Sequence, residues 1–332
     1  MIHTCTQACE LPADWDDAIG DNLYLRRDFL EFMEACEACD QRYYYIRDGD
    51  GVMDTVFTTH LRRRFDVMMF RTANFRVDTT MVYIPASVSR PGIAAGRHLS
   101  QALDHIRSLP GLTLMLNFPD EHLPGFASGL TCPKHILTLN WDCFDDYIDQ
   151  MRGGYRRRYR KALRDSAGLR LRTLDDPSEF DEELYGLYLQ VLQRSRTIIE
   201  TLSIEYFRGH FFTILVLEDD SGPQGFVQLL PNGTELIFEF VGVNYATNAT
   251  HDTYHRLLLE IVKYGIEHGF STIDFGQTAD ESKLKLGCQP VTLYAGLHHS
   301  NPVIMVGTRL LAPHLTYPVV TNNFRVFKEA VQ

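Results

Sequence analysis

The segment Phe270–Gly287, FSTIDFGQTADESKLKLG, gives the strongest indication of the fold. Its first residues are rich in β-branched and aromatic side chains and predict a strand, which a glycine turn follows. Asp274 and Gln277 then lie where the strand ends, and Lys283 or Lys285 returns across the same opening. Ligands of open α/β sheets bind at such strand ends, and an ammonium group there can stabilise an oxyanion or a phosphate. A buried strand followed by a solvated lysine is the alternative interpretation of these residues alone.

Periodic apolar residues around this segment predict a regular series of helices and strands. Asn232-Gly233 is a strong hairpin signal between two of the strands, and Gly269 ends the long helix before the opening segment. The order is helices, three antiparallel strands, a crossover helix and further strands. Besides the opening strand, the predicted helices are 155–167, 181–196, one beginning near Ser203, and 252–268, and the predicted strands are 212–218, 225–230, 235–243 and 291–299.

The first half of the chain repeats that order in outline. We therefore predict a mixed α/β fold of two tandem domains, each with a mixed, mostly antiparallel sheet flanked by helices. The pattern changes at NWDCFDDYIDQMRGGY, which predicts domains at 1–139 and 140–332. The elements predicted for the first half are helices at 28–39 and 92–108 and strands at 43–47, 52–61, 65–70, 81–84 and 112–118.

The composition is that of an ordinary globular protein, with 332 residues, 45% hydrophobic and 23% charged. No apolar run reaches the ~18 residues that a membrane-spanning helix needs, so we predict no membrane partner. The N-terminus turns acidic where a signal peptide would have its apolar core, which indicates a cytoplasmic protein. The formal net charge of -11 argues against a protein that coats nucleic acid with its whole surface.

The seven cysteines are odd in number and dispersed, which does not fit a disulfide framework. Cys5, Cys9, Cys36 and Cys39 can be written as a zinc site, which leaves a zinc-dependent enzyme as a minor alternative. Cys36 and Cys39 fall in a predicted amphipathic helix, however, where cysteine is commonly a small apolar residue. We therefore predict that no metal is bound.

One segment departs from the acidic composition. Residues 151–164, MRGGYRRRYRKALR, contain seven basic residues and no acidic one. On a helix Arg157, Arg160, Lys161 and Arg164 share a face, because residues three and four apart are neighbours. A phosphate or RNA contact and a solvated helix face are both compatible with this pattern, and the two interleaved tyrosines could pack or stack on bases.

Several phrases of the second half resemble the GNAT acyltransferase superfamily in its doubled, Fem-like form. They are YRRRYRKAL followed by GLRLR, DEELYGLYLQVLQRSR, the hairpin GFVQLL and ELIFEFVG, and the helix entering IDFGQTADESKLKLG. These phrases lie between residues 139 and 299, whereas the first half matches only in outline. The resemblance implies transfer of an acyl or aminoacyl group to an amine, with the donor in the second domain and a degenerate first domain on the acceptor side.

The resemblance also implies a place for the donor. In GNAT proteins the donor lies where two strands splay apart, and its phosphates meet the N-terminus of the crossover helix, where N–H groups and the helix dipole favour an anion. Here that place is 245–254, YATNATHDTY, which lacks the closely spaced glycines of the family's phosphate loop. Fem-like enzymes share that loss and use aminoacyl-tRNA, and relatives accept carrier-protein thioesters. We expect aminoacyl-tRNA, or a coenzyme A or carrier-protein thioester, as the donor, and no tightly bound cofactor.

Fem-like enzymes also carry a lysine shortly after the strand that ends in a DFG-like sequence. The matching residue is Lys283, with Lys285 as the alternative if the turn is longer. By resemblance this lysine would contact the donor and stabilise the oxyanion of the tetrahedral intermediate, a contribution of ~3 to 4 kcal/mol for one well-placed donor group. Asp274 and Gln277 would line the same donor site.

A transferase must also remove a proton from the incoming amine. Glu239 is the candidate base, because it lies in a strand with apolar neighbours; a sheet carboxylate that faces solvent or an arginine is the alternative. Tyr254 could donate a hydrogen bond to the donor carbonyl or merely pack. His251 and Asp252 precede the crossover helix and could contact the donor, although Asp252 better fits a helix cap.

Three further residues are weaker candidates. Arg194 and Arg196 end the second predicted helix and could line the acceptor site, although the helix dipole alone favours arginines there. Cys288 could form an acyl-cysteine intermediate, but no histidine lies near it in the sequence. Direct attack on the donor is therefore the preferred mechanism.

The sequence thus predicts an acyl- or aminoacyltransferase that joins an activated carboxyl group to an amine of a small molecule or peptide, with Lys283 as an electrostatic catalyst. A non-catalytic binding module on the same fold is the alternative, because the phosphate loop is missing. The acceptor, the acyl group and the oligomeric state stay open.

Overall fold

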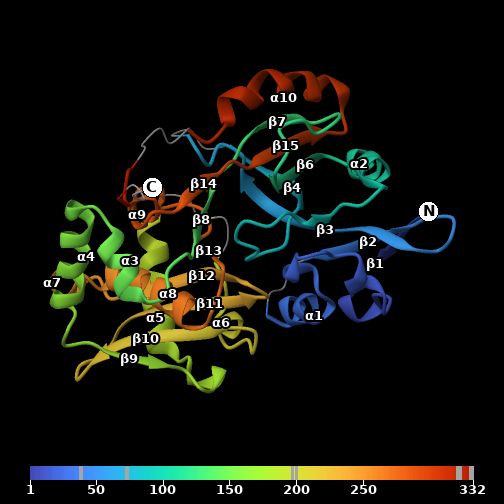
Figure 1. The fold of residues 1–332 in the computed structure, drawn as a ribbon. Coiled ribbons are helices and arrows are strands. Elements are labelled where there is room, and N and C mark those ends of the chain that lie inside the picture. The colour runs from blue at the N-terminus through green and yellow to red at the C-terminus, as the bar shows by residue number, and fades with distance from the viewer. Residues whose placement is uncertain (37–39, 72–74, 196–197, 199–200, 319–323, 329–332) are drawn as a thin grey trace. The chain divides into compact units, whose positions relative to one another are not determined.

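The structure, a computed structural model, describes residues 1–36, 40–71, 75–195, 198, 201–318 and 324–328 (Figure 1). Contacts within the chain divide it into two compact units. The first unit is Met1–Pro133 with Thr292–Val319, and the second is Lys134–Val291 with Val320–Gln332. Within the described residues, every helix is too short or too polar to cross a lipid bilayer.

The second unit is built on a mixed sheet in the order β14-β8-β13-β12-β11-β10-β9. Strands β10, β11 and β12 form the predicted antiparallel series. Strands β12 and β13 are parallel, and helix α8 connects them as a crossover. The strands are β8 (Lys134–Thr138), β9 (Arg170–Thr173), β10 (Thr213–Asp219), β11 (Gly222–Asn232), β12 (Glu235–Val243), β13 (Thr272–Asp274) and β14 (Gln289–Val291).

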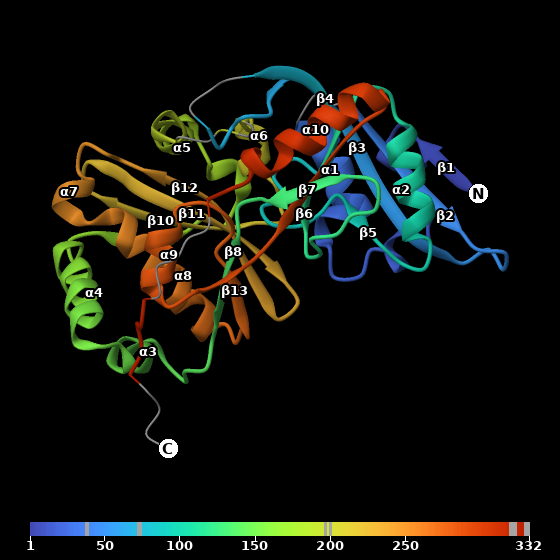
Figure 2. The same ribbon diagram turned by 90° about the horizontal axis from the view of Figure 1, so that it is seen from above.

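Helices cover both faces of this sheet. Figure 2 shows α5 and α6 on one face and α8 on the other, and α3 and α4 pack against α8. The helices are α3 (Phe144–Gln150), α4 (Gly153–Asp165), the 3-10 helix η4 (Pro177–Glu179), α5 (Glu182–Arg194), α6 (Ile204–Phe207), α7 (Asn248–His251), α8 (Thr253–Glu267) and α9 (Asp280–Leu286).

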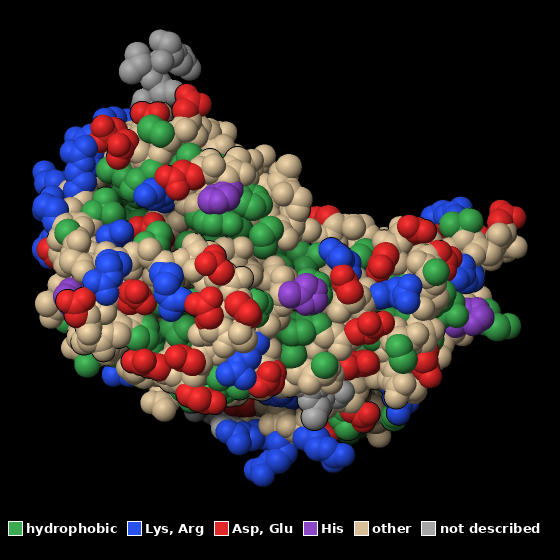
Figure 3. Space-filling view, turned by 90° about the horizontal axis from the view of Figure 1, so that it is seen from below, with side chains coloured by type: hydrophobic (Ala, Val, Ile, Leu, Met, Phe, Trp, Pro, Cys, Tyr) green, Lys and Arg blue, Asp and Glu red, His purple; other side chains and the backbone are tan. Residues whose placement is uncertain are grey.

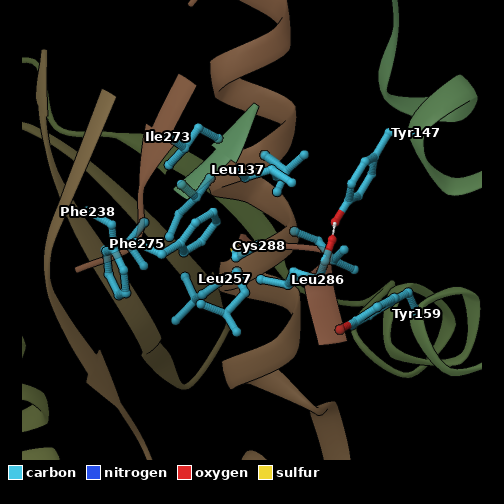
Figure 4. Packing of buried hydrophobic residues seen from close by; sticks show 14 of the residues in the cluster. Leu137, Tyr147, Tyr159, Phe238, Leu257, Ile273, Phe275, Leu286 and Cys288 are labelled. Carbon is cyan, nitrogen blue, oxygen red and sulfur yellow. Dashed lines mark hydrogen bonds between the residues drawn. The ribbon is translucent and has the colours of Figure 1, made fainter. Parts of the chain in front are cut away.

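The core of the second unit forms between α8 and the sheet. Leu257, Leu258, Ile261 and Val262 recur at helical spacing on α8, and all four are fully buried. Figure 4 shows Leu257 close to Leu286, on the side of the sheet that α8 covers. Burial of each such side chain contributes about 1.5 to 3 kcal/mol, so this stripe holds the crossover helix in place.

The first unit repeats the arrangement with its own parallel pair, β4 and β6, connected through α2. Its sheet has the order β1-β2-β3-β4-β6-β15-β7, and β5 pairs with β3. The strands are β1 (Ile2–Cys5), β2 (Gln41–Arg47), β3 (Met53–Asp66), β4 (Arg76–Val82), β5 (Ile93–Ala94), β6 (Leu112–Phe118), β7 (Ala127–Leu130) and β15 (Tyr294–His299). The helices are η1 (Ala8–Glu10), η2 (Trp15–Asp17), η3 (Leu23–Leu25), α1 (Arg27–Cys36), α2 (Leu99–Ser108) and α10 (Pro302–Leu315).

The predicted mixed α/β fold with two similar units is confirmed, but the units are not contiguous in sequence. The predicted strand 291–299 is two strands: β14 ends at Val291 and pairs with β8, whereas β15 begins at Tyr294 and pairs with β6 and β7. The chain therefore returns to the first unit after residue 291. The predicted division into 1–139 and 140–332 does not include this return. Strand partners are tertiary contacts, so periodicity alone did not separate the two strands.

Two predicted elements of the first half are wrong. Residues 65–70 are not a separate strand, because β3 runs to Asp66 and the Asp66 carboxylate then accepts hydrogen bonds from the N–H groups of Met68 and Phe75. The helix predicted from residue 92 begins only at Leu99. A Cβ on Gly96 would lie 2.1 Å from the carbonyl oxygen of Asp54, so the segment before α2 is packed closely on β3.

The stripe on α8 yields a test of stability. Leu257→Ala should lower the free energy of unfolding by about 2 to 5 kcal/mol, because it removes buried methyl groups and leaves a cavity beside β11. Urea unfolding followed by circular dichroism measures the change. Leu171→Ala, at a side chain that is 41% exposed, is the control and should change stability by less than about 0.5 kcal/mol. Equal losses in both variants would contradict the assignment of α8 to the core.

Candidate functional site

Strands β12 and β13 pair over only part of their course. Glu235–Ile237 pairs with Thr272–Asp274, and β12 then continues to Val243 along β11. After β13 the chain stays with β8 instead, because the N–H of Phe275 donates to the carbonyl of His135 at 2.8 Å. The two parallel strands therefore part after three residue pairs, at the C-terminal end of β13.

A β-bulge lies on β12 just beyond this point. Phe238 pairs with Leu229 and Phe240 with Gln228, which leaves Glu239 as the extra residue. Glu239 is 8% exposed, and the hydroxyl of Tyr206 on α6 donates to its Oε2 at 3.4 Å. A bulge re-aims side chains and ends regular pairing, so this bulge promotes the divergence of the strands. The structure thus places Glu239 in a buried position on the α6 side.

Lys283 lies on α9, whose helical form was not predicted from the sequence. Its side chain is 3% exposed, and Nζ donates to the carbonyl oxygen of Gln277 at 2.6 Å. The loop from β13 to α9 contains two successive non-glycine residues with positive φ, Thr278 at 63° and Ala279 at 51°. Each such residue costs roughly 1 to 2 kcal/mol, a strain that folding tolerates where surrounding contacts determine the conformation. The loop thereby holds the ammonium group at the end of β13.

A buried polar cluster surrounds Lys283. Asp274 is fully buried; its Oδ1 accepts from the N–H of Gly276 at 2.7 Å, and its Oδ2 lies 4.0 Å from Nζ of Lys134. His135 is also fully buried, with Nδ1 3.2 Å from the carbonyl oxygen of Gly276 and Nε2 3.6 Å from Oδ1 of Asp280. Burial, and next the charge of Lys283, hold the pKa of His135 below its ordinary value. His135 is therefore neutral at pH 7, and Lys283 rather than His135 carries the positive charge here.

The sequence reasoning missed His135. It stands in a strand of unremarkable pattern that is more than 130 residues away from its partners in the chain, so no local signal marks it. Lys285, the alternative to Lys283, lies on the outside of α9. Its Nζ pairs with Glu281 and stands 5.5 Å from the centre of the Phe324 ring. Of the two lysines, the structure brings Lys283 to the end of β13.

The segment before α8 is closed by its own hydrogen bonds. The Gln224 side chain is buried and accepts from Thr247 Oγ1 and Asn244 Nδ2, and the Gln190 side chain accepts from the N–H of Tyr245. A bonded N–H group does not also bind an anion, so most N–H groups of this segment are not available to a pyrophosphate. The N–H groups that donate within the protein are those of Asn244, Tyr245, Ala246, Thr247, Asn248, Thr250, His251, Asp252 and Tyr254.

Asp252 does not act as the helix cap that the sequence suggested. It is the residue before α8 and has φ of 50°, but its carboxylate makes no capping hydrogen bond. Its Oδ1 instead lies 2.6 Å from Nδ1 of His255, and Nε2 of that histidine lies 2.8 Å from the guanidinium of Arg158. The side chain of Asn248 bonds the N–H of Tyr254 and takes the capping role. The ring of His255 therefore connects the start of α8 to α4.

Tyr254 joins α8 to α9. Burial raises the pKa of its phenol to about 12, and a hydrogen bond with Ser282 opposes that shift. The phenol is consequently neutral at physiological pH, and its hydrogen-bond partner Ser282 is the residue before Lys283 on α9. His251 ends α7, is partly exposed, and lowers the pKa of Asp219 only as a minor contributor. Tyr254 thus contacts the helix that carries Lys283, and a shared role for the two residues stays a prediction.

The basic helix α4 lies beside α7 and α8. Lys and Arg side chains gather along the left edge in Figure 3, the side on which α4 lies in Figure 1. Arg160 pairs with Asp149 and Lys161 with Asp165, whereas no carboxylate within the described residues pairs with Arg157, which is exposed. Arg164 is likewise exposed and unpaired among those residues. The two interleaved tyrosines pack inward on the core, so they do not form a stacking surface.

Of the two candidate acceptor residues, only one can be placed. The guanidinium of Arg194 lies over the ring of Tyr245, 4.1 Å from its centre, at the C-terminal end of α5. This cation–π contact joins α5 to the segment before α8. Arg196 lies outside the described residues.

The structure does not favour Cys288 as a nucleophile. The thiol is 2% exposed, and burial raises its pKa well above the ordinary range despite the nearby charge of Lys283. Figure 4 shows Cys288 enclosed between Leu257, Leu286 and Phe275. A neutral thiol is a poor nucleophile, so an acyl-cysteine intermediate does not fit. Among the described residues, no group of three or more His, Cys, Asp or Glu side chains could hold a metal ion, and Cys39 of the suggested zinc set lies outside them.

The burial of Cys288 makes a prediction that needs no substrate. Iodoacetamide at pH 8 should modify the exposed Cys9 and Cys143 in the folded protein and leave Cys288 unmodified, because the thiolate is the reactive form. Peptide mass spectrometry measures each site. In guanidinium chloride all three should react, which controls for peptide recovery. Modification of Cys288 in the folded protein at the rate of Cys9 would contradict this description.

Comparison with known proteins gives the fold a family context. Residues 149–284 match the family described as the acetyltransferase (GNAT) domain. A search of curated protein sequences found no match. Among solved structures, the C-terminal domain of a putative lysylphosphatidylglycerol synthetase from Agrobacterium fabrum is similar, with TM-score 0.53, 10% identity and coverage of 90% of this chain and 94% of that chain.

Two further structures have the same architecture. FemX aligns with TM-score 0.50 and 9% identity over 83% of this chain and 92% of its own. A tandem GNAT protein from the clavulanic acid biosynthesis pathway aligns with TM-score 0.50 and 14% identity over 91% of this chain and 99% of its own. At these identities the likeness concerns the fold alone. The chain therefore carries a GNAT domain at residues 149–284 and has the tandem, Fem-like GNAT fold.

Proposed function

We propose that the protein is an N-acyltransferase that moves an activated acyl or aminoacyl group to an amine, with the second unit holding the donor. The observation that carries the proposal is the parting of β12 and β13 beside Lys283. Diverging parallel strands leave backbone groups available to a substrate in extended form, and the lysine stands at the end of β13 where a carbonyl would reach it.

The chemical step needs no covalent enzyme intermediate. The amine nitrogen attacks the donor carbonyl, and the C–O or C–S bond to the leaving group breaks as the amide forms. The amine loses a proton and the leaving oxygen or sulfur gains one. We assign oxyanion stabilisation to Lys283, with the neutral phenol of Tyr254 as a second hydrogen-bond donor. Glu239 is the candidate base, and its buried position beside Tyr206 suits a carboxylate that accepts the proton.

The donor is proposed to arrive on a large acidic carrier. The internal hydrogen bonds of residues 244–254 support a donor that is not held through a pyrophosphate at the start of α8. Affinity must then come from elsewhere, and α4 offers exposed arginines next to that place. Arg158 meets His255 of α8 directly. Aminoacyl-tRNA is the favoured donor, since a phosphodiester chain presents the regular negative charge that such a helix face binds.

The role of Lys283 can be tested against its neighbour on the same helix. In a screen for product formation by mass spectrometry, Lys283→Met should reduce kcat/KM about 10²- to 10³-fold, because the oxyanion loses a charged partner. Lys285→Met makes the same substitution at a side chain that points outward. Its kcat/KM should stay within about threefold of the wild-type value. Melting temperatures establish that both variants fold. Full activity of a folded Lys283→Met would remove the assigned role.

The donor can be identified by binding. Fluorescence anisotropy with total tRNA should show binding that weakens with salt, and Arg157→Glu with Arg164→Glu should lower the slope of log affinity against log salt by about one unit for each arginine. Arg170→Glu, at an exposed arginine on β9, is the matched control. Two results together would contradict aminoacyl-tRNA as the donor: the protein binds coenzyme A that tRNA does not displace, and the α4 variants bind as wild type does. The donor would then be a thioester, and the proposal of acyl transfer would stand.

A further inference from the structure

Helix α10 of the first unit is apolar on its outward face. Met305 and Ala312 face inward and pack with Ala127 of β7, and each is 5% exposed. At 100° per residue the large exposed side chains span an arc of about 160° opposite these two. They are Val303 at 79%, Ile304 at 50%, Val306 at 59%, Leu310 at 71% and Leu311 at 59% exposed.

Such a helix is unusual on a protein surface. A surface helix normally has one apolar stripe toward the core and charged residues on the other side, whereas a helix that is apolar all round is buried. On α10 the charged residue Arg309 lies about 60° outside the outward arc, and the exposed His314 lies within it at the C-terminal end. Contiguous exposed apolar side chains of this extent mark a contact surface. The aliphatic arc of α10 therefore requires a partner that accepts apolar groups.

A basic hairpin is attached to this helix. Arg71, in the turn between β3 and β4, donates to the carbonyl oxygens of His314 and Thr316 at the C-terminal end of α10. Phe70 of the same turn packs against Tyr317, with 5.2 Å between ring centres. Figure 2 shows the hairpin and the helix side by side.

The hairpin itself combines positive charge with exposed apolar groups. Arg63, Arg64 and Arg76 are exposed, and no carboxylate within the described residues pairs with their side chains. Phe75, next to Arg76, is 60% exposed, and Leu61 is 39% exposed. The chain as a whole carries a formal charge of -11, so this positive cluster is a local reversal rather than an overall trend.

We infer that α10 and the β3–β4 hairpin form a peripheral docking surface for an anionic phospholipid bilayer. The aliphatic arc of α10 enters the boundary between headgroups and acyl chains, and the arginines of the hairpin contact the phosphate headgroups. Apolar insertion and basic contact are the two signals that together give stable but reversible membrane association. The absence of a spanning segment led to the prediction of no membrane partner, but surface docking needs no spanning segment.

Other partners fit this surface less well. A nucleic acid would use the arginines and leave the aliphatic arc in water. A second copy of the chain could cover the arc, but symmetric contact of α10 with α10 would bring two attached arginine hairpins together without neutralising them. An anionic bilayer satisfies both features at once, because it offers hydrocarbon beneath a layer of negative charge.

Vesicle co-sedimentation of the full chain tests the inference. Wild type should bind vesicles of phosphatidylcholine with about one-third phosphatidylserine at least tenfold more tightly than vesicles of phosphatidylcholine alone, and salt should weaken binding. Leu310→Glu should reduce binding about tenfold or more through loss of insertion. Arg63→Glu with Arg64→Glu should reduce it about 25-fold, since each arginine near the surface contributes about fivefold.

Matched controls separate this surface from general effects. Val52→Glu places the same charge at another exposed apolar site, 55% exposed, and Arg170→Glu reverses an arginine of the second unit; both should bind as wild type does. Binding that is absent for wild type, or unchanged in Leu310→Glu, would overturn the inference. So would a dimer in light scattering that Leu310→Glu converts to a monomer, because α10 would then be covered by a second copy. Acyl transfer is measured separately and does not decide this question.

Discussion

The pairing of β12 with β13 is confined to three residue pairs, and the arrangement of the second unit's site depends on this limit. The bulge at Glu239 alters the course of β12, while the backbone of Phe275 bonds to β8 and carries β13 away. Were the two strands paired along their whole length, ladder hydrogen bonds would consume the backbone groups at this place. Their parting leaves those groups available and lets α9 bring Lys283 to the end of β13.

The surroundings of Lys283 contain several features that destabilise the folded state. Two non-glycine residues with positive φ precede α9, and a buried histidine, a buried carboxylate and a buried lysine lie close together. Each of these features opposes folding by itself, because strained backbone and desolvated charge raise the free energy of the folded state. The apolar packing of α8 against the sheet supplies stability that offsets them. Polar groups concentrated at one place, on a scaffold stabilised elsewhere, are typical of a functional site.

The segment that replaces the phosphate loop shows how one position in a fold can change its use. A glycine-rich loop directs N–H groups outward to an anion. Most N–H groups of residues 244–254 instead donate to the Gln190 side chain, the Gln224 carbonyl, or carbonyls and asparagine side chains of the segment itself. These internal hydrogen bonds hold the segment before α8 in place without a bound phosphate. In the function that we propose, the attraction for an acidic donor comes from a side-chain surface such as α4. Side-chain charge is screened by salt more readily than an enclosed nest is, which makes the ionic strength of an assay important.

The amino-acid sequence alone determined the order of elements in the second unit, the hairpin at Asn232-Gly233 and the crossover helix, because these follow from local periodicity, turn residues and recognisable phrases. It also marked Lys283 as a candidate, and the structure places that lysine near the end of β13. It did not reveal His135, the helical form of α9 or the exchange of β15 into the first unit. Those features depend on pairing and burial between residues far apart in the chain, which no local pattern encodes. Likewise only the tertiary structure decided that the outward face of α10 is uncovered, since an apolar helix reads the same whether it is buried or exposed.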